Sequence, residues 1–84
     1  MTGFVYRDFD GHRLRVDPEA DMGYIRVSNG AFGWNDLRDK LRGVIVGWDA
    51  FGNLLGIEIF LRNGEVRPES AAVIRRLLRC PSSA

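Results

Sequence analysis

The stretch GVIVGWDAFGNLLGIEIFL, residues 43–61, decides the fold. Two runs rich in β-branched and aromatic residues flank the short segment DAFGN at residues 49–53, as expected for two strands joined by a turn. Asp49 suits the first position of a type I turn, and Gly52 suits the left-handed residue that follows it. The pattern therefore predicts an antiparallel β-hairpin with a three-residue loop and a glycine bulge.

The register of this hairpin determines which side chains share a face. Pairing Asp49 with Asn53 puts Ile45 opposite Ile57. One face then carries Ile45, Leu55, Ile57, Ile59 and Leu61. The other carries Val44, Val46, Trp48, Leu54 and Phe60, interrupted by Glu58. Two apolar faces are unusual for an antiparallel hairpin, which commonly has one wet side, so each face needs a cover.

A helix at about residues 68–80 supplies one cover. Pro68 lies near its start, Pro81 lies just past its end, and apolar residues recur at helical spacing at Val73, Ile74, Leu77 and Leu78. A second copy of the chain is the predicted cover for the other face, because large exposed apolar patches are rare on monomers. The sequence thus predicts a homodimer with Val44, Val46, Trp48, Leu54 and Phe60 as the candidate interface and Trp48 as its anchor.

The remaining segments complete the predicted architecture. Residues 3–9 and 12–16 alternate around Asp10–Gly11, a strong hairpin signal, and residues 22–27 predict a third strand. For residues 31–42, a helical turn, a loop and an irregular strand all fit. We therefore predict one domain over residues 1–84, of the α+β class: an antiparallel β-meander of about five strands with a C-terminal helix packed on one face.

Composition excludes several classes of protein. The 84 residues are 45% hydrophobic with a net charge of +1, which gives no general attraction to nucleic acid. No apolar run is long enough to cross a bilayer, so no membrane association is predicted. The single cysteine, Cys80, cannot form an internal disulfide, and a cytoplasmic location is the expectation.

The carboxylates Asp17, Glu19 and Asp21 resemble the start of a calcium loop. Gly23 comes one residue too late, however, and the twelfth position, Ser28, is not a bidentate carboxylate. The better interpretation is a turn that begins at Asp17, where Pro18 fixes the next backbone angle. We predict no metal and no cofactor.

Catalytic residues are not predicted either. The spacing of the single histidine, His12, supports no nucleophilic pair with Cys80. Glu58 interrupts an apolar face, which suits either a general acid or base or a structural ion pair with Arg42 or Arg62. The ion pair is the favoured interpretation, and an enzyme built on Glu58 and Asp49 is the third-ranked hypothesis for function.

Nucleic-acid binding is the second-ranked hypothesis. Arg75, Arg76 and Arg79 cluster on the predicted helix as candidate phosphate contacts. Aromatic and arginine residues also interleave elsewhere, a pattern that suits single strands although such aromatics more often belong to a core. These residues are Tyr24, Arg26, Trp34, Arg38 and Arg42.

Two stretches, VDPEADMGYIRVSNG at residues 16–30 and GVIVGWDAFGNLLGIEIF at residues 43–60, together resemble domain-of-unknown-function family 2283. The resemblance covers about residues 14–61. It implies a small antiparallel β domain of bacteria and their phages with no established activity, and it implies framework roles for Asp17, Asp21, Tyr24 and Glu58. The chain departs from the family at Gly47, where an acid is usual, and at Gly23, where an aliphatic residue is usual.

These observations together favour a non-enzymatic protein, either an interaction module or an accessory or regulatory protein of a bacterium or phage. Its expected partners are a second copy of itself and a further protein whose identity the sequence does not reveal.

Overall fold

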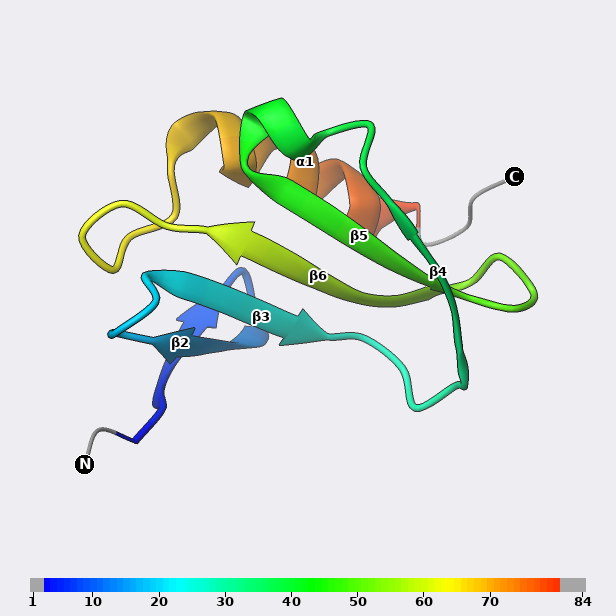
Figure 1. Ribbon diagram of the computed structural model, residues 1–84, viewed down its shortest axis with the longest axis horizontal. Coiled ribbons are helices and arrows are strands. Elements are labelled where there is room, and N and C mark those ends of the chain that lie inside the picture. The colour runs from blue at the N-terminus through cyan, green and yellow to red at the C-terminus, as the bar shows by residue number, and fades with distance from the viewer. Residues whose placement is uncertain (1–2, 81–84) are drawn as a thin grey trace.

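The computed structural model describes residues 3–80 and shows a six-stranded antiparallel sheet with one C-terminal helix (Figure 1). The strands are β1 (Val5–Phe9), β2 (His12–Asp17), β3 (Met22–Arg26), β4 (Phe32–Asp36), β5 (Val44–Asp49) and β6 (Leu54–Phe60). A 3₁₀ helix, η1, spans Lys40–Arg42, and the α-helix, α1, spans Pro68–Arg79. The predicted α+β class, the antiparallel sheet and the helix on one face are confirmed.

The strand order is β1-β2-β3-β6-β5-β4, so the chain does not form a simple meander. After β3 it crosses to the far edge of the sheet, forms β4, and returns through β5 to β6, which pairs with β3. The sixth strand, β4, lies in the segment that sequence patterns left ambiguous. Most of β4 is exposed, so it carries little of the apolar alternation that marks a half-buried strand.

Both predicted hairpin turns have the expected backbone. Asp10 and Gly11 adopt positive φ angles of 50° and 82°, as a type I′ turn requires. At the β5–β6 turn, Gly52 has φ 84°, and the N–H of Asp49 donates to the carbonyl of Asn53 at 2.9 Å. The glycine-bulge loop at residues 49–53 is therefore confirmed.

The predicted register beyond this turn is wrong by one residue. Trp48 pairs with Leu54, but Gly47 pairs with Gly56, so Leu55 is an extra residue in β6. Such a β-bulge shifts every later pair and moves each side chain to the opposite face. Ile45 consequently lies opposite Glu58, and Val46 lies opposite Ile57.

The corrected register gives the hairpin one strongly apolar face instead of two. That face packs beneath α1 (Figure 1), where Ile57, Ile59 and Ile74 are completely buried. Val73 and Leu77, two other predicted contact residues of the helix, are buried with them. On the opposite face Glu58 is exposed, while Ile45 and Phe60 are only half-buried.

Four of the five predicted interface residues belong to the core of a single chain: Val44, Val46, Trp48 and Leu54. Their exposed fractions are no higher than 4%, so the prediction that they form an external interface is wrong. Phe60, the fifth, lies on the other face of the sheet. A homodimer through this hairpin therefore lacks the apolar surface that was predicted for it, because that surface depended on the wrong register.

The face of the sheet opposite α1 has no helix over it within residues 3–80. In the same part of the chain, no helix is long and apolar enough to cross a membrane.

Candidate functional site

The acidic cluster before β3 has a structural task. One carboxylate oxygen of Asp17 accepts the backbone N–H groups of Glu19 and Ala20 at 3.1 and 3.3 Å, which confirms the predicted turn. The carboxylate of Asp21 accepts the N–H groups of Asn63 and Gly64 at 3.0 and 2.8 Å. Asp21 thus fixes the loop between β6 and α1, a contact across 42 residues of chain that sequence spacing does not reveal. Within residues 3–80, no group of three or more His, Cys, Asp or Glu side chains has metal-site geometry.

Asp49 is likewise occupied by its own turn. Its Oδ1 accepts the N–H groups of Phe51 and Asn53, both at 2.9 Å. The bond from Asn53 is the main cause that lowers the pKa of this carboxyl below its ordinary value, against the opposing effect of burial. Glu58 lies opposite Ile45. Ile45 is four residues before Asp49 in β5, which corresponds to about 13 Å at the usual rise of a strand. The two carboxylates proposed for an enzyme therefore do not share a site.

Two of the three arginines of α1 form ion pairs within the molecule. Arg75 binds Asp10 at 2.7 Å, which raises the pKa of the guanidinium, and Arg76 binds Asp39 at 3.1 Å. Arg79 forms no ion pair with the residues that the structure describes. Of the three arginines that the sequence predicted as phosphate contacts, only Arg79 is therefore without an ion pair among the described residues.

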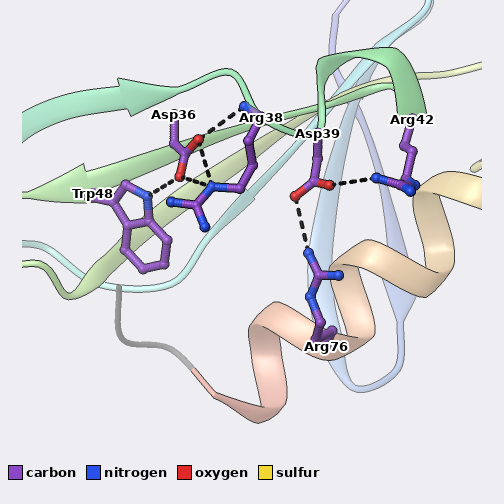
Figure 2. Close-up of polar contacts among 6 residues, drawn as sticks. All are labelled: Asp36, Arg38, Asp39, Arg42, Trp48 and Arg76. Carbon is purple, nitrogen blue, oxygen red and sulfur yellow. Dashed lines mark hydrogen bonds and ion pairs between the residues drawn. The ribbon is translucent and has the colours of Figure 1, made fainter. Parts of the chain in front are cut away.

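Asp39 ties η1 to the helix. Its two oxygens receive Arg42 at 3.2 Å and Arg76 at 3.1 Å, and its side chain is only 6% exposed (Figure 2). Arg42 is therefore paired with Asp39 and not with Glu58, which corrects one of the two predicted partners of Glu58. Neither Arg42 nor Arg62 forms an ion pair with Glu58.

Asp36, at the end of β4, forms a second buried polar cluster (Figure 2). Its carboxylate accepts the indole N–H of Trp48 at 3.2 Å and binds Arg38 Nε at 3.0 Å. Burial raises the pKa of this carboxyl, but the hydrogen bonds from Arg38 and Trp48 outweigh burial and leave the pKa lowered. Trp34 stacks beside Trp48 with ring centres 6.4 Å apart. Trp34, Arg38 and Arg42 are thus engaged around β4 and η1, away from Tyr24 and Arg26, and the predicted interleaved set is not one surface.

The face opposite α1, which we call the open face, carries a different set of arginines and aromatic rings. Paired residues form a row across the strands: Tyr6, Arg15, Tyr24, Glu58 and Ile45. A second row runs beside it: Arg26, Gly56, Gly47 and Asn35. Strand alternation adds Phe4, Arg13 and two carboxylates, Asp8 and Asp17, to the same face, and Asp8 lies directly opposite Arg13.

Two guanidinium groups on the open face, those of Arg13 and Arg15, lie over aromatic rings. The Arg13 guanidinium carbon is 4.1 Å from the ring centre of Tyr6. That of Arg15 is 4.5 Å from the ring centre of Phe4 and 5.5 Å from that of Tyr24. Cation–π attraction at these distances holds the guanidiniums against the rings and keeps the stacks ordered.

Two shallow depressions flank this stack. One, of about 380 Å³, is lined by Phe4, Arg15, Tyr24 and Glu58, among others. The other, of about 340 Å³, is lined by Tyr6, Arg13, Arg15, Tyr24 and Arg26. Arg15 and Tyr24 border both, so the two depressions form one continuous candidate binding surface.

Tyr24 and Arg26 were predicted from the sequence as candidate contacts, but Arg13 and Arg15 were not. The signal was present in HRLRV, where Arg13 and Arg15 alternate with the core residues Leu14 and Val16. This strand pairs with β1, and Tyr6 in β1 and Phe4 just before it alternate in the same way, so the two sets lie on one face.

Comparison with known proteins identifies a family but no activity. The family described as "Protein of unknown function (DUF2283)" matches residues 13–60, which is more than half of the chain and runs from the second residue of β2 to the end of β6. No curated protein and no solved structure matches the chain.

Proposed function

Because the chain belongs to the DUF2283 family, whose description names no activity, we propose its function from its own geometry. We propose that it is a non-enzymatic binding module that holds single-stranded nucleic acid on the open face. The observation that supports this proposal is the stack of Arg13 and Arg15 on aromatic rings, with Arg26 beside it. None of these three arginines forms an ion pair with a carboxylate within residues 3–80.

The distribution of ion pairs distinguishes these arginines from the rest. Six of the eleven arginines bind carboxylates, and they are Arg7, Arg38, Arg42, Arg67, Arg75 and Arg76. Of the other five, three lie together on the open face. Arg26 donates only to the carbonyl of Ser28, at 2.6 Å, and that bond leaves its charge uncompensated.

This chemistry fits a nucleic-acid strand better than an apolar partner. Guanidinium groups match phosphate oxygens, and exposed aromatic rings provide platforms on which bases stack. Phe4 and Tyr6 are about half exposed, at 53% and 52%, so their rings are accessible. A single strand can present both phosphates and base faces to such a surface, whereas a duplex hides its base faces.

The sheet is a better site for this function than α1. Arg75 and Arg76 already neutralise Asp10 and Asp39, and no aromatic platform accompanies Arg79 among the contacts that the structure describes. We therefore propose the open face as the nucleic-acid surface in place of the helix.

The test is fluorescence anisotropy of a labelled strand of about 12 nucleotides, a length in the usual range for one binding domain. The affinity should fall as salt rises, and Arg15→Gln should reduce the slope of log K against log salt by about 0.7. Arg79→Gln is the matched control, because it removes an uncommitted arginine from the helix, and it should leave binding unchanged. The usual dissociation constants of non-specific binding extend to about 100 µM. No anisotropy change at that protein concentration in low salt would overturn the proposal.

Self-association is a second candidate function, favoured by the edge strand β4. Within residues 3–80, one side of β4 has no neighbouring strand, and the side chains of Phe32 and Trp34 in β4 are 61% and 42% exposed. An edge with free backbone groups and exposed apolar side chains suits pairing with another strand, either of a second copy or of another protein. We therefore propose that a homodimer, if formed, uses β4 and not the β5–β6 hairpin.

Light scattering at high micromolar concentration tests this second candidate. A dimer would have twice the 9.5 kDa mass of the chain, and Phe32→Lys should return it to a monomer. Phe51→Lys is the control, because Phe51 is 90% exposed in the β5–β6 turn and not on the edge. A monomer mass for the unmodified protein would exclude the homodimer.

A further inference from the structure

Glu58 is the one carboxylate in the centre of the arginine–aromatic row on the open face. It lies directly opposite Tyr24 in β3, and Tyr24 lies directly opposite Arg15 in β2. Glu58 is exposed, and its carboxylate forms no ion pair with any residue in the described part of the chain. A structural ion pair therefore does not account for its presence.

The order of charges across the sheet would orient a bound strand. Phosphates are attracted to Arg13, Arg15 and Arg26 on β2 and β3, and they are repelled by Glu58 on β6. Asp8, opposite Arg13, and Asp17, at the end of β2, repel phosphates from the margins of the face. The sugar–phosphate backbone should therefore follow the arginines, with the bases directed across Tyr24 toward β6. This inference rests on the proposed function, because it describes the ligand of the same surface.

We propose that Glu58 selects guanine over thymine and uracil at this end of the open face. An ionised carboxylate has two oxygens that only accept hydrogen bonds. The Watson–Crick edge of guanine presents two adjacent donors, the N1–H and the N2 amino group, which match these oxygens. Thymine and uracil present one N–H between two carbonyl oxygens, and those carbonyls repel the carboxylate.

The surroundings of Glu58 suit this role. Glu58 and Tyr24 line the same depression of about 380 Å³ as Phe4 and Arg15. A base stacked on an aromatic ring there would present its edge within the plane of the ring, toward a neighbouring strand. Next to this row, Gly47 presents no side chain on the open face, so a strand can approach the sheet closely there, whereas the ring of Tyr24 covers Gly56.

The size of the selection is modest, because Glu58 is in contact with water. We expect guanine-containing strands to bind about fivefold to tenfold more tightly, near the lower end of the discrimination given by a bidentate base contact. Binding to thymine strands should come mainly from stacking and phosphate contacts.

The experiment compares three labelled strands of equal length by anisotropy. The first contains only thymine, the second has isolated guanines between thymines, and the third has inosine at the guanine positions. Inosine lacks the N2 amino group but keeps the N1–H and a similar stacking surface. Lithium salt prevents guanine strands from associating with one another. The unmodified protein should prefer guanine over both inosine and thymine.

Two variants separate selection from general binding. Glu58→Gln should bind all three strands with similar affinity, and it should bind thymine at least as well as the unmodified protein because a repulsive charge is gone. Asp17→Asn is the matched control: Asp17 lines the same depression, but its oxygen serves the local turn. It should keep the guanine preference. Melting temperatures of both variants show whether they remain folded.

Each outcome has a defined meaning. Equal affinity of the unmodified protein for guanine and thymine strands overturns the role of Glu58 and leaves the proposed function intact. A guanine preference that persists in Glu58→Gln also overturns it. If none of the three strands binds at low salt, both the proposed function and this inference are wrong.

Discussion

The hydroxyl end of Tyr24 occupies the space beside Gly56 that a β-carbon would otherwise fill. Tyr24 pairs with Glu58, so Gly56 is its diagonal neighbour in β6, two residues away from the direct partner. Diagonal neighbours in a sheet are within reach of aromatic side chains. The missing side chain at position 56 thus sets where the ring of Tyr24 lies on the open face.

This contact predicts that Gly56→Ala acts on binding more than on folding. The added methyl group would meet the far end of the tyrosine ring, which can move, and would displace the ring from its position beside Arg15. We expect a loss of affinity for single-stranded nucleic acid with a small change in melting temperature. Anisotropy and thermal unfolding of the same samples measure both.

A double-mutant cycle supplies the control for Gly56→Ala. If the methyl group acts through the ring, then adding Gly56→Ala to Tyr24→Ala should have no further effect on affinity. Full additivity of the two changes would show that position 56 affects binding by another route.

The register of the central hairpin predicts opposite outcomes for two isoleucines. Ile57 is completely buried beneath α1, whereas Ile45 is half-buried on the open face. Ile57→Ala should lower the free energy of unfolding by about 2–5 kcal/mol, and Ile45→Ala should cost clearly less. Chemical denaturation measures both values. Equal losses for the two variants would contradict the bulge at Leu55, because that bulge gives the two residues their different faces.

The same bulge shows how far the sequence predicts this fold. Turn residues and apolar runs identified the β5–β6 hairpin and its loop, because Gly52 and Asp49 act through local backbone conformation. The bulge itself leaves no local signal, since Leu54 and Leu55 are both buried apolar residues. A one-residue shift then exchanged the two faces and produced a spurious apolar surface.

Long-range placement explains why the candidate site was only partly predicted. Tyr24 and Glu58 were identified from their own segments. They become neighbours only because β3 pairs with β6 and not with β4, the next strand along the chain. Arg15 becomes part of the site only through its pairing with Tyr24 and Tyr6. Composition also gave no sign of the site. The net charge of +1 sums all basic and acidic residues and does not distinguish arginines with a carboxylate partner from those without one.

Asp36 predicts a specific loss of stability in acid. Its folded-state pKa is lowered from the ordinary value of 3.8, so the ionised form is favoured by folding. That contribution is complete above the ordinary pKa and is lost as the pH falls through the lowered one. Asp36→Asn should therefore destabilise the protein by about 1–3 kcal/mol at pH 6, the cost of hydrogen bonds to a charged group, and by less near pH 2.

Chemical denaturation at several pH values between about 2 and 6 tests this prediction. Glu19→Gln is the control, since Glu19 is exposed and forms no ion pair with the residues that the structure describes. It should show the same pH dependence as the unmodified protein. A constant difference between Asp36→Asn and the unmodified protein over the whole range would assign its role to packing instead of charge.

The last prediction concerns Asp21, whose carboxylate binds two backbone N–H groups and whose own φ of 54° is left-handed. Asp21→Ala should lower the free energy of unfolding by about 1–3 kcal/mol, because it removes both hydrogen bonds and places alanine in a left-handed conformation. Asp21→Asn should cost less, since asparagine tolerates that conformation and keeps one acceptor oxygen. Calcium should not change the melting temperature of the unmodified protein, because only a ligand that prefers the folded state raises it. A rise of several degrees with calcium that disappears in Asp21→Asn would show instead that these oxygens exchange their backbone partners for a metal ion.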